Sequence, residues 1–308
     1  MGDTKIHKVF QILGVVALIA GVALMFGGGG FNLQAYFYGW TFWACVSFGG
    51  LGLMLLHHAA RGHWGFPILR ILEAAGGPLM LTLVALGFIP IALGMGSLYE
   101  WTDPEVAKTL GAKGEWYLTE GPWLGRSIFY FVFMIGISYV LTKWQKEDDE
   151  KGDDANKQKR INTAAVGLLV FALVINFAFT DWAQSMMPHW FSTIYGIWFV
   201  VMQALAMMGL VAIIIGSQAD KAPFKDVINN YIRKDIGNLL LAMTLLWAYF
   251  SFSQYLIIYS GDMPEFTSYW HYRRQGGFEN LGIALIALGF FVPFLMLLSP
   301  RMKREPKN

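Results

Sequence analysis

Long stretches without a single Asp, Glu, Lys or Arg constrain this chain more than any other feature of its sequence. Seven such stretches occur, at residues 9–60, 74–99, 127–142, 161–180, 182–219, 236–261 and 280–300. An α-helix needs about 20 apolar residues to cross the hydrocarbon core of a bilayer. Each stretch therefore has roughly the length of one membrane span, and the first is long enough for two.

The stretches predict an all-α integral membrane protein with about eight transmembrane helices. A glycine run at 27–30 separates the two spans of the first stretch. A transmembrane β-barrel would alternate polar and apolar residues, and these stretches do not. The predicted helices cover residues 9–26, 36–57, 78–98, 123–142, 162–180, 190–216, 237–259 and 280–299.

Composition excludes the main alternatives. Charged residues make up 14% of the chain and hydrophobic residues 56%, with a mean hydropathy of +0.46. A soluble domain carries about 25% charged residues, and a disordered chain lacks this much apolar side chain. Cys45 is the only cysteine, which excludes an internal disulfide and an iron–sulfur cluster ligated by this chain alone. The net charge of +2 gives no electrostatic reason to expect nucleic-acid binding.

Basic residues predict the orientation. With eight spans, 18 of the 23 Lys and Arg residues fall on the side that holds both termini, and five fall on the opposite side. The positive-inside rule then predicts that both termini lie in the cytoplasm. The alternative, that the first apolar segment is a signal peptide, has no small-residue cleavage site to support it.

A charged segment at 143–161 divides the chain. Its sequence begins KWQKEDDEKGDDANKQKR, and this mixture of charges is typical of a solvated, flexible connector. Helices 1–4 (1–142) and helices 5–8 (162–308) would form two four-helix-bundle-like halves in the same orientation, as a duplication gives. A short echo between Tyr38-Gly39 and Tyr195-Gly196 makes duplication plausible.

A candidate site lies at the predicted turn between helices 5 and 6, on the side away from the cytoplasm. Asp181 ends helix 5 and His189 follows eight residues later, so we expect these two side chains to accept protons or to line a proton exit. Four further side chains would bind a quinone headgroup: Ser192, Thr193 and Tyr195, with Gln254 facing them from helix 7. The alternative is a solvated turn in which Asp181 and His189 only cap helix ends.

The loops on the same side are rich in aromatic residues and arginine. We expect the loops between helices 3 and 4 and between helices 7 and 8 to dock partner subunits through Trp101, Trp116, Trp270, Arg273 and Arg274. Trp, Tyr and Arg are enriched at interface hot spots. The alternative is an aromatic belt of the kind found at any membrane surface.

Three segments resemble a known family. They are DWAQSMMPHWFSTIYGIWF (181–199), IPIALGMGSLYEW (89–101) and AYFSFSQYLIIYSGDMPEF (248–266). With the charged linker, they make the chain similar to the membrane subunits of the NrfD/polysulfide-reductase superfamily. Within that superfamily, the similarity is closest to the ActF type of bacterial alternative complex III.

The resemblance implies a role in quinol oxidation. Such a subunit would belong to a quinol:cytochrome c (or similar acceptor) oxidoreductase and would support quinol oxidation or conduct protons. Its partners would be a related NrfD-like membrane subunit, a periplasmic iron–sulfur subunit and c-type cytochrome subunits, which hold the iron–sulfur clusters and haem c. Menaquinol or another quinol would be the ligand. Family members continue with further helices past 301–308, so the sequence is expected to be truncated or to lack those helices.

Two other classes of protein remain open. None of the six histidines lies in the middle of a predicted span, and no metal-binding motif occurs, so we expect no haem, no metal and no redox cofactor of this chain's own. A transporter or proton channel would use the few polar side chains within the spans, among them Asn176, Gln203 and Gln254. A purely structural anchor of a complex would need none of them.

Overall fold

The computed structural model describes residues 32–218, 221–222 and 224–304, and all regular structure within these ranges is helical. Seven helical segments there are long and apolar enough to cross a membrane: Leu33–Ala60, Phe66–Leu93, Glu120–Lys151, Lys157–Met186, Tyr195–Gln218, Asn230–Gly261 and Phe278–Leu298. They confirm seven of the eight predicted helices. The first predicted helix, 9–26, lies outside the described residues.

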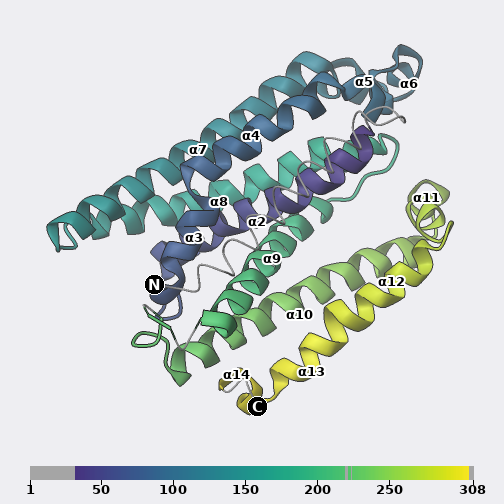
Figure 1. The fold of residues 1–308 in the computed structure, drawn as a ribbon. Helices are drawn as coiled ribbons and strands as arrows, with labels where there is room; N and C mark the ends of the chain where they lie inside the picture. The colour runs from purple at the N-terminus through teal and green to yellow at the C-terminus, as the bar shows by residue number, and fades with distance from the viewer. Residues whose placement is uncertain (1–31, 219–220, 223, 305–308) are drawn as a thin grey trace.

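The helices carry the labels of Figure 1. The long ones are α2 (Leu33–Ala60), α4 (Pro78–Leu93), α7 (Glu120–Lys151), α8 (Lys157–Trp182), α9 (Tyr195–Gln218) and α10 (Asn230–Gly261). The shorter ones are α3 (Leu69–Gly76), α5 (Met95–Leu98), α6 (Pro104–Thr109), α11 (Pro264–Arg273), α12 (Phe278–Ile286), α13 (Val292–Leu298) and α14 (Pro300–Arg304). Single turns lie at Phe66–Ile68, Glu100–Thr102, Lys113–Tyr117, Gln184–Met186 and Ala287–Phe291.

The centre of the molecule is α2, which packs against α4, α8 and α9. The helix α7 lies against α4 and α8, while α10 packs on α9, and α13 packs on α10 (Figure 1). Close approach of α2 and α9 depends on Gly49, because a Cβ there would clash with the backbone carbonyl of Gln203. Such small residues allow membrane helices to pack tightly without a hydrophobic driving force. The helix α8 packs on both α7 and α9, so it joins the two halves expected from the sequence.

The connections gather at two ends of the bundle, as the predicted alternation of helices requires. We call one the linker end, where Arg61 pairs with Asp154 at 3.4 Å and Lys303 Nζ donates to Asn238 at 2.7 Å. We call the other the loop end, which consists of residues 94–119, 183–194 and 262–277 together with the adjoining ends of the helices that these segments connect. There the Tyr99 hydroxyl donates to the carbonyl of Trp182 at 2.9 Å.

The charged segment 143–161 is an ordered helical hairpin, which corrects the expectation of a flexible connector. The 32 residues of α7 span about 48 Å, and the hydrocarbon core of a bilayer is only about 30 Å thick. Asp148 is buried and accepts hydrogen bonds from Arg160 and from the side chain of Asn156. Gly152, at a φ of 67°, closes the turn. The buried Asp148–Arg160 ion pair holds the two helices together. A solvated, flexible segment would contain no such buried pair.

Two helix boundaries differ from the prediction. The helix α9 begins at Tyr195 rather than at residue 190, and the segment before it is irregular after Pro188. The last span is interrupted by a π-type turn at Ala287–Phe291, just before Pro293. Proline lacks the N–H that an α-helix requires, and a π-bulge accommodates such a defect.

Candidate functional site

Asp181 is the most thoroughly buried charged residue at the loop end. It lies in the last turn of α8, with none of its surface exposed. The Arg126 guanidinium meets it with two hydrogen bonds, from Nε to Oδ2 at 2.8 Å and from Nη2 to Oδ1 at 3.0 Å. The Tyr130 hydroxyl donates to Oδ2 at 2.7 Å. Arg126 and Tyr130 are four residues apart on α7, so one helix face presents both to the carboxylate.

The surroundings hold this ion pair in place. Arg126 also donates to the carbonyl of Tyr117 at 3.0 Å, and its guanidinium carbon lies 3.9 Å from the centre of the Tyr117 ring. The Trp123 indole donates to the backbone carbonyl of Asp181 at 2.9 Å. The carboxylate thus accepts three hydrogen bonds and is buried, which differs from the alternative of a solvated turn.

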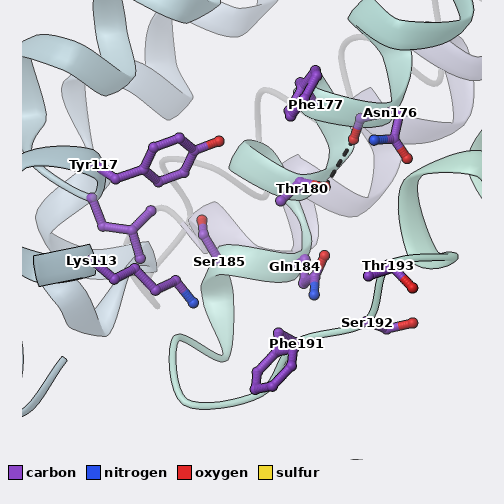
Figure 2. A pocket seen from close by; sticks show the side chains of 11 residues that line it. Lys113, Tyr117, Asn176, Phe177, Thr180, Gln184, Ser185, Phe191, Ser192 and Thr193 are labelled. Atoms are coloured by element: carbon purple, nitrogen blue, oxygen red, sulfur yellow. Dashed lines mark hydrogen bonds between the residues drawn. The ribbon is translucent and has the colours of Figure 1, made fainter. Parts of the chain in front are cut away.

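A cavity of about 380 Å³ lies beside this ion pair, between the Lys113–Tyr117 turn, α8 and the irregular segment before α9. In Figure 2, Lys113 and Tyr117 lie on one side and Ser192 and Thr193 on the other, with Gln184 between them. The full lining is Lys113, Tyr117, Leu118, Asn176, Phe177, Thr180, Gln184, Ser185, Phe191, Ser192 and Thr193. This volume falls in the range of small-molecule pockets.

Two residues of the lining carry buried acceptor atoms without a partner. They are the amide oxygens Oε1 of Gln184 and Oδ1 of Asn176. Buried polar atoms nearly always have a partner, from the protein, from water or from a ligand. Both oxygens are enclosed, so a molecule with hydroxyl groups in the cavity would reach them through a change of the amide side-chain rotamers.

The opposite side of the cavity supplies a cation and a phenol. Lys113 Nζ donates to the carbonyl of Pro188 at 2.8 Å and so links the two loops. Burial lowers the pKa of Lys113. Burial also raises the pKa of Tyr117 to about 12, and the negative charge of Asp181 acts in the same direction. Tyr117 therefore remains a neutral hydrogen-bond donor at physiological pH.

The structure places some of the predicted catalytic and quinone-binding residues at the cavity and others away from it. His189 is exposed, with Nε2 3.4 Å from the Thr109 hydroxyl, and it does not join Asp181. Ser192 and Thr193 line the cavity, and the Ser192 hydroxyl donates to Oε1 of Gln254 at 2.5 Å.

Tyr195 lies outside the cavity. It is the first residue of α9, rather than one and a half turns into the helix, and it is buried among aromatic rings.

The predicted docking residues also divide. Trp116 is 67% exposed, and Arg273 and Arg274 are exposed as well, while Trp270 is half-buried. Trp101 is buried in this chain, with its indole 3.3 Å from the hydroxyl of Ser185. Its role is therefore internal packing, which corrects its assignment as a docking residue.

Sequence reasoning missed Arg126, Tyr130, Lys113, Tyr117 and Gln184. Arg126 had a usable signal, because it begins one charge-free stretch just as Asp181 ends the next on the same side of the membrane. Two isolated opposite charges at adjacent helix ends are expected to pair. The described residues contain no group of three or more His, Cys, Asp or Glu side chains that could hold a metal ion.

The long apolar helices identify the chain as an all-α membrane protein with several spans. No protein-family model matches the sequence, and no curated protein matches it.

Proposed function

We propose that this chain is the membrane subunit of a quinol:electron-acceptor oxidoreductase and that it binds the quinol headgroup in the loop-end cavity. The observation that carries this proposal is the pair of unpartnered acceptors, Gln184 Oε1 and Asn176 Oδ1, on side chains of a cavity that also presents aromatic rings, hydroxyl groups and one amine. A quinol headgroup combines two hydroxyl donors with an apolar ring. Its shape and polarity therefore complement this lining.

The chemistry assigns distinct parts to the chain and its partners. Oxidation of a quinol to a quinone releases two protons and two electrons. The electrons would pass to an iron–sulfur or c-type haem centre on a partner subunit. The protons would leave at the loop end. His189 is exposed there and belongs to the same segment as Gln184 and Ser192 of the cavity lining, so its imidazole would accept them. Lys113 and Tyr117 line the cavity and would donate hydrogen bonds to the headgroup oxygens. The Asp181 carboxylate would not contact the headgroup, because Arg126 already engages it.

The resemblance to the NrfD superfamily, and to ActF of alternative complex III within it, supports the same assignment. In this proposal the linker end faces the cytoplasm of a bacterial inner membrane, and the loop end faces the periplasm. Exposed Trp116 would then meet the periplasmic subunits. Electron transport in a respiratory chain is the corresponding process.

Binding of a quinol analogue to the purified chain tests the proposal. We expect Gln184→Leu and Asn176→Leu each to weaken binding about fivefold to tenfold, which corresponds to one lost hydrogen bond. Gln275→Leu is the matched control, because Gln275 is an exposed amide at the same end of the molecule. Wild-type affinity in both cavity variants would contradict a headgroup site in this cavity. No binding by the wild-type chain would favour a structural anchor.

A second candidate function, proton conduction, has one specific observation in its favour. Gln203 lies about 12 Å along α9 from Tyr195, is 1% exposed, and has no partner for either of its amide atoms. Water is the usual partner of such a buried amide. At the linker end, His57 Nδ1 and His58 Nε2 are likewise buried and unpartnered. A chain of hydrogen-bonded water molecules between Gln203 and the two histidines would carry protons.

Proteoliposomes with a pH-sensitive dye inside test this second function. We expect Gln203→Leu to abolish proton flux driven by a membrane potential while quinol-analogue binding remains unchanged. Equal flux in wild type and variant would remove Gln203 from any proton path.

A further inference from the structure

Tryptophan N–H groups in the described residues fall into two sets. The indoles of Trp40, Trp123 and Trp182 each donate to an oxygen 2.9 Å away. The indole N–H groups of Trp190, Trp198 and Trp270 are buried and have no acceptor. An indole nitrogen can only donate, and a buried one usually has a partner. The described residues therefore leave these three donors open to an acceptor from elsewhere.

All three unpartnered indoles belong to one row of aromatic rings at the loop end. Trp190 stacks on Tyr269 of α11 with ring centres 4.3 Å apart, and Trp270 meets Tyr269 edge-on at 5.2 Å. On the other side, Tyr195 lies 5.5 Å from Trp190 and 6.2 Å from Trp198. The row runs from the start of α9 to α11 and lies outside the cavity lining. It is thus a separate feature from the proposed quinol site.

One face of α11 adds positive charge to this row. Arg273 and Arg274 follow Trp270 by three and four residues, so all three share a helix face. Both arginines are exposed, and neither has an ion-pair partner among the described residues. The Arg273 guanidinium carbon lies 3.5 Å from the centre of the Tyr269 ring, which holds it beside the row. This face offers N–H donors and positive charge.

The helices that adjoin α11 present an apolar wall. The helix α12 has no buried residue, and its exposed side chains include Leu281 and Leu285. Phe252, Leu256 and Tyr259 are exposed on α10. Donors and cations at the helix ends, above a long apolar surface, match a ligand with an anionic, acceptor-rich head and aliphatic chains.

We infer that α11 and the adjoining ends of α9 and α10 bind an anionic phospholipid. Its phosphate would meet Arg273 and Arg274, and a phosphate or ester oxygen would accept from the indole of Trp270. The Trp270 side chain is half-buried and its N–H is enclosed, so this contact would require a change of side-chain rotamer. A neutral quinone would use the indole donors but would leave both arginines without a counter-charge. The charge of the site therefore selects the phospholipid.

Native mass spectrometry of the purified full chain tests this inference. The protein is exchanged into detergent with equal amounts of phosphatidylglycerol and phosphatidylcholine, and retained lipid is counted. We expect wild type to retain phosphatidylglycerol. We expect both Arg273→Gln/Arg274→Gln and Trp270→Phe to lower its occupancy at least about tenfold, since each removes hydrogen bonds to a charged group. Lys108→Gln/Trp116→Phe is the matched control, because both residues are exposed at the same end.

Three other outcomes would overturn the inference. Equal retention of both lipids, or loss of phosphatidylglycerol in the control variant, overturns the inference. So does displacement of the lipid by millimolar glycerol phosphate, which would place the affinity in the phosphate alone. The quinol-analogue assay uses other residues, so each proposal can fail without the other.

Discussion

The Arg126–Asp181 pair should contribute more to stability than any other ion pair at the loop end. Removing one member of a buried pair costs about 3–5 kcal/mol, because the remaining charge stays buried without a partner. Asp181 is fully buried, whereas the Arg126 side chain is 25% exposed and water can reach it. We therefore expect about 3 kcal/mol for Asp181→Leu and about 4 kcal/mol for Arg126→Leu, which leaves the deeper charge unpaired.

A double-mutant cycle measures the interaction itself. The double variant leaves no buried charge, so its cost should be well below the sum, with a coupling energy of at least about 2 kcal/mol. Unfolding in mixed detergent micelles, followed by tryptophan fluorescence, gives the four free energies. The exposed Glu105–Lys108 pair is the matched control and should couple by no more than about 0.5 kcal/mol. A coupling that small for Arg126–Asp181 would refute the reasoning.

Two further predictions use the same unfolding assay. Gly49→Ala should destabilise the protein by about 1–3 kcal/mol through its clash with Gln203, whereas Gly39→Ala, with open space around it, should be neutral or slightly stabilising; equal effects would contradict close packing at Gly49. Because the pKa of Tyr117 is raised from about 10 to about 12, the folded state holds this proton more tightly than the unfolded chain. The resulting stability is present below pH 10 and is lost as the pH rises toward 12, so Tyr117→Phe should flatten this fall and exposed Tyr139→Phe should not. Identical pH profiles for wild type and Tyr117→Phe would disprove the assignment.

The spans could be predicted because a bilayer imposes one simple rule on every one of them. A charge-free run of about 20 residues has few other uses, so helices such as α9 and α10 were predictable from composition alone. The distribution of loops between the two ends followed from the alternation of spans. Boundaries were less certain, because Pro188 and the hydroxyl side chains after it delay the start of α9 without changing the hydropathy.

The site was harder to predict, because its partners are far apart in the sequence. Arg126 and Asp181 are 55 residues apart, and only the packing of α7 on α8 brings them together. Asp148 and Arg160 posed the opposite problem, since a charged segment gives no sign of which two charges will be buried. In both cases, the sequence contained the residues but not their burial, which depends on neighbouring helices.

The ordered hairpin formed by the ends of α7 and α8 also offers a handle for imaging. Because α7 and α8 are joined by a tight turn at residues 152–156, a helical carrier protein inserted there in phase with both helices would inherit their direction. A membrane protein of 34.6 kDa is small for single-particle alignment in a micelle. Such a graft would add a rigid landmark at the linker end and leave the cavity and α11 free for ligands.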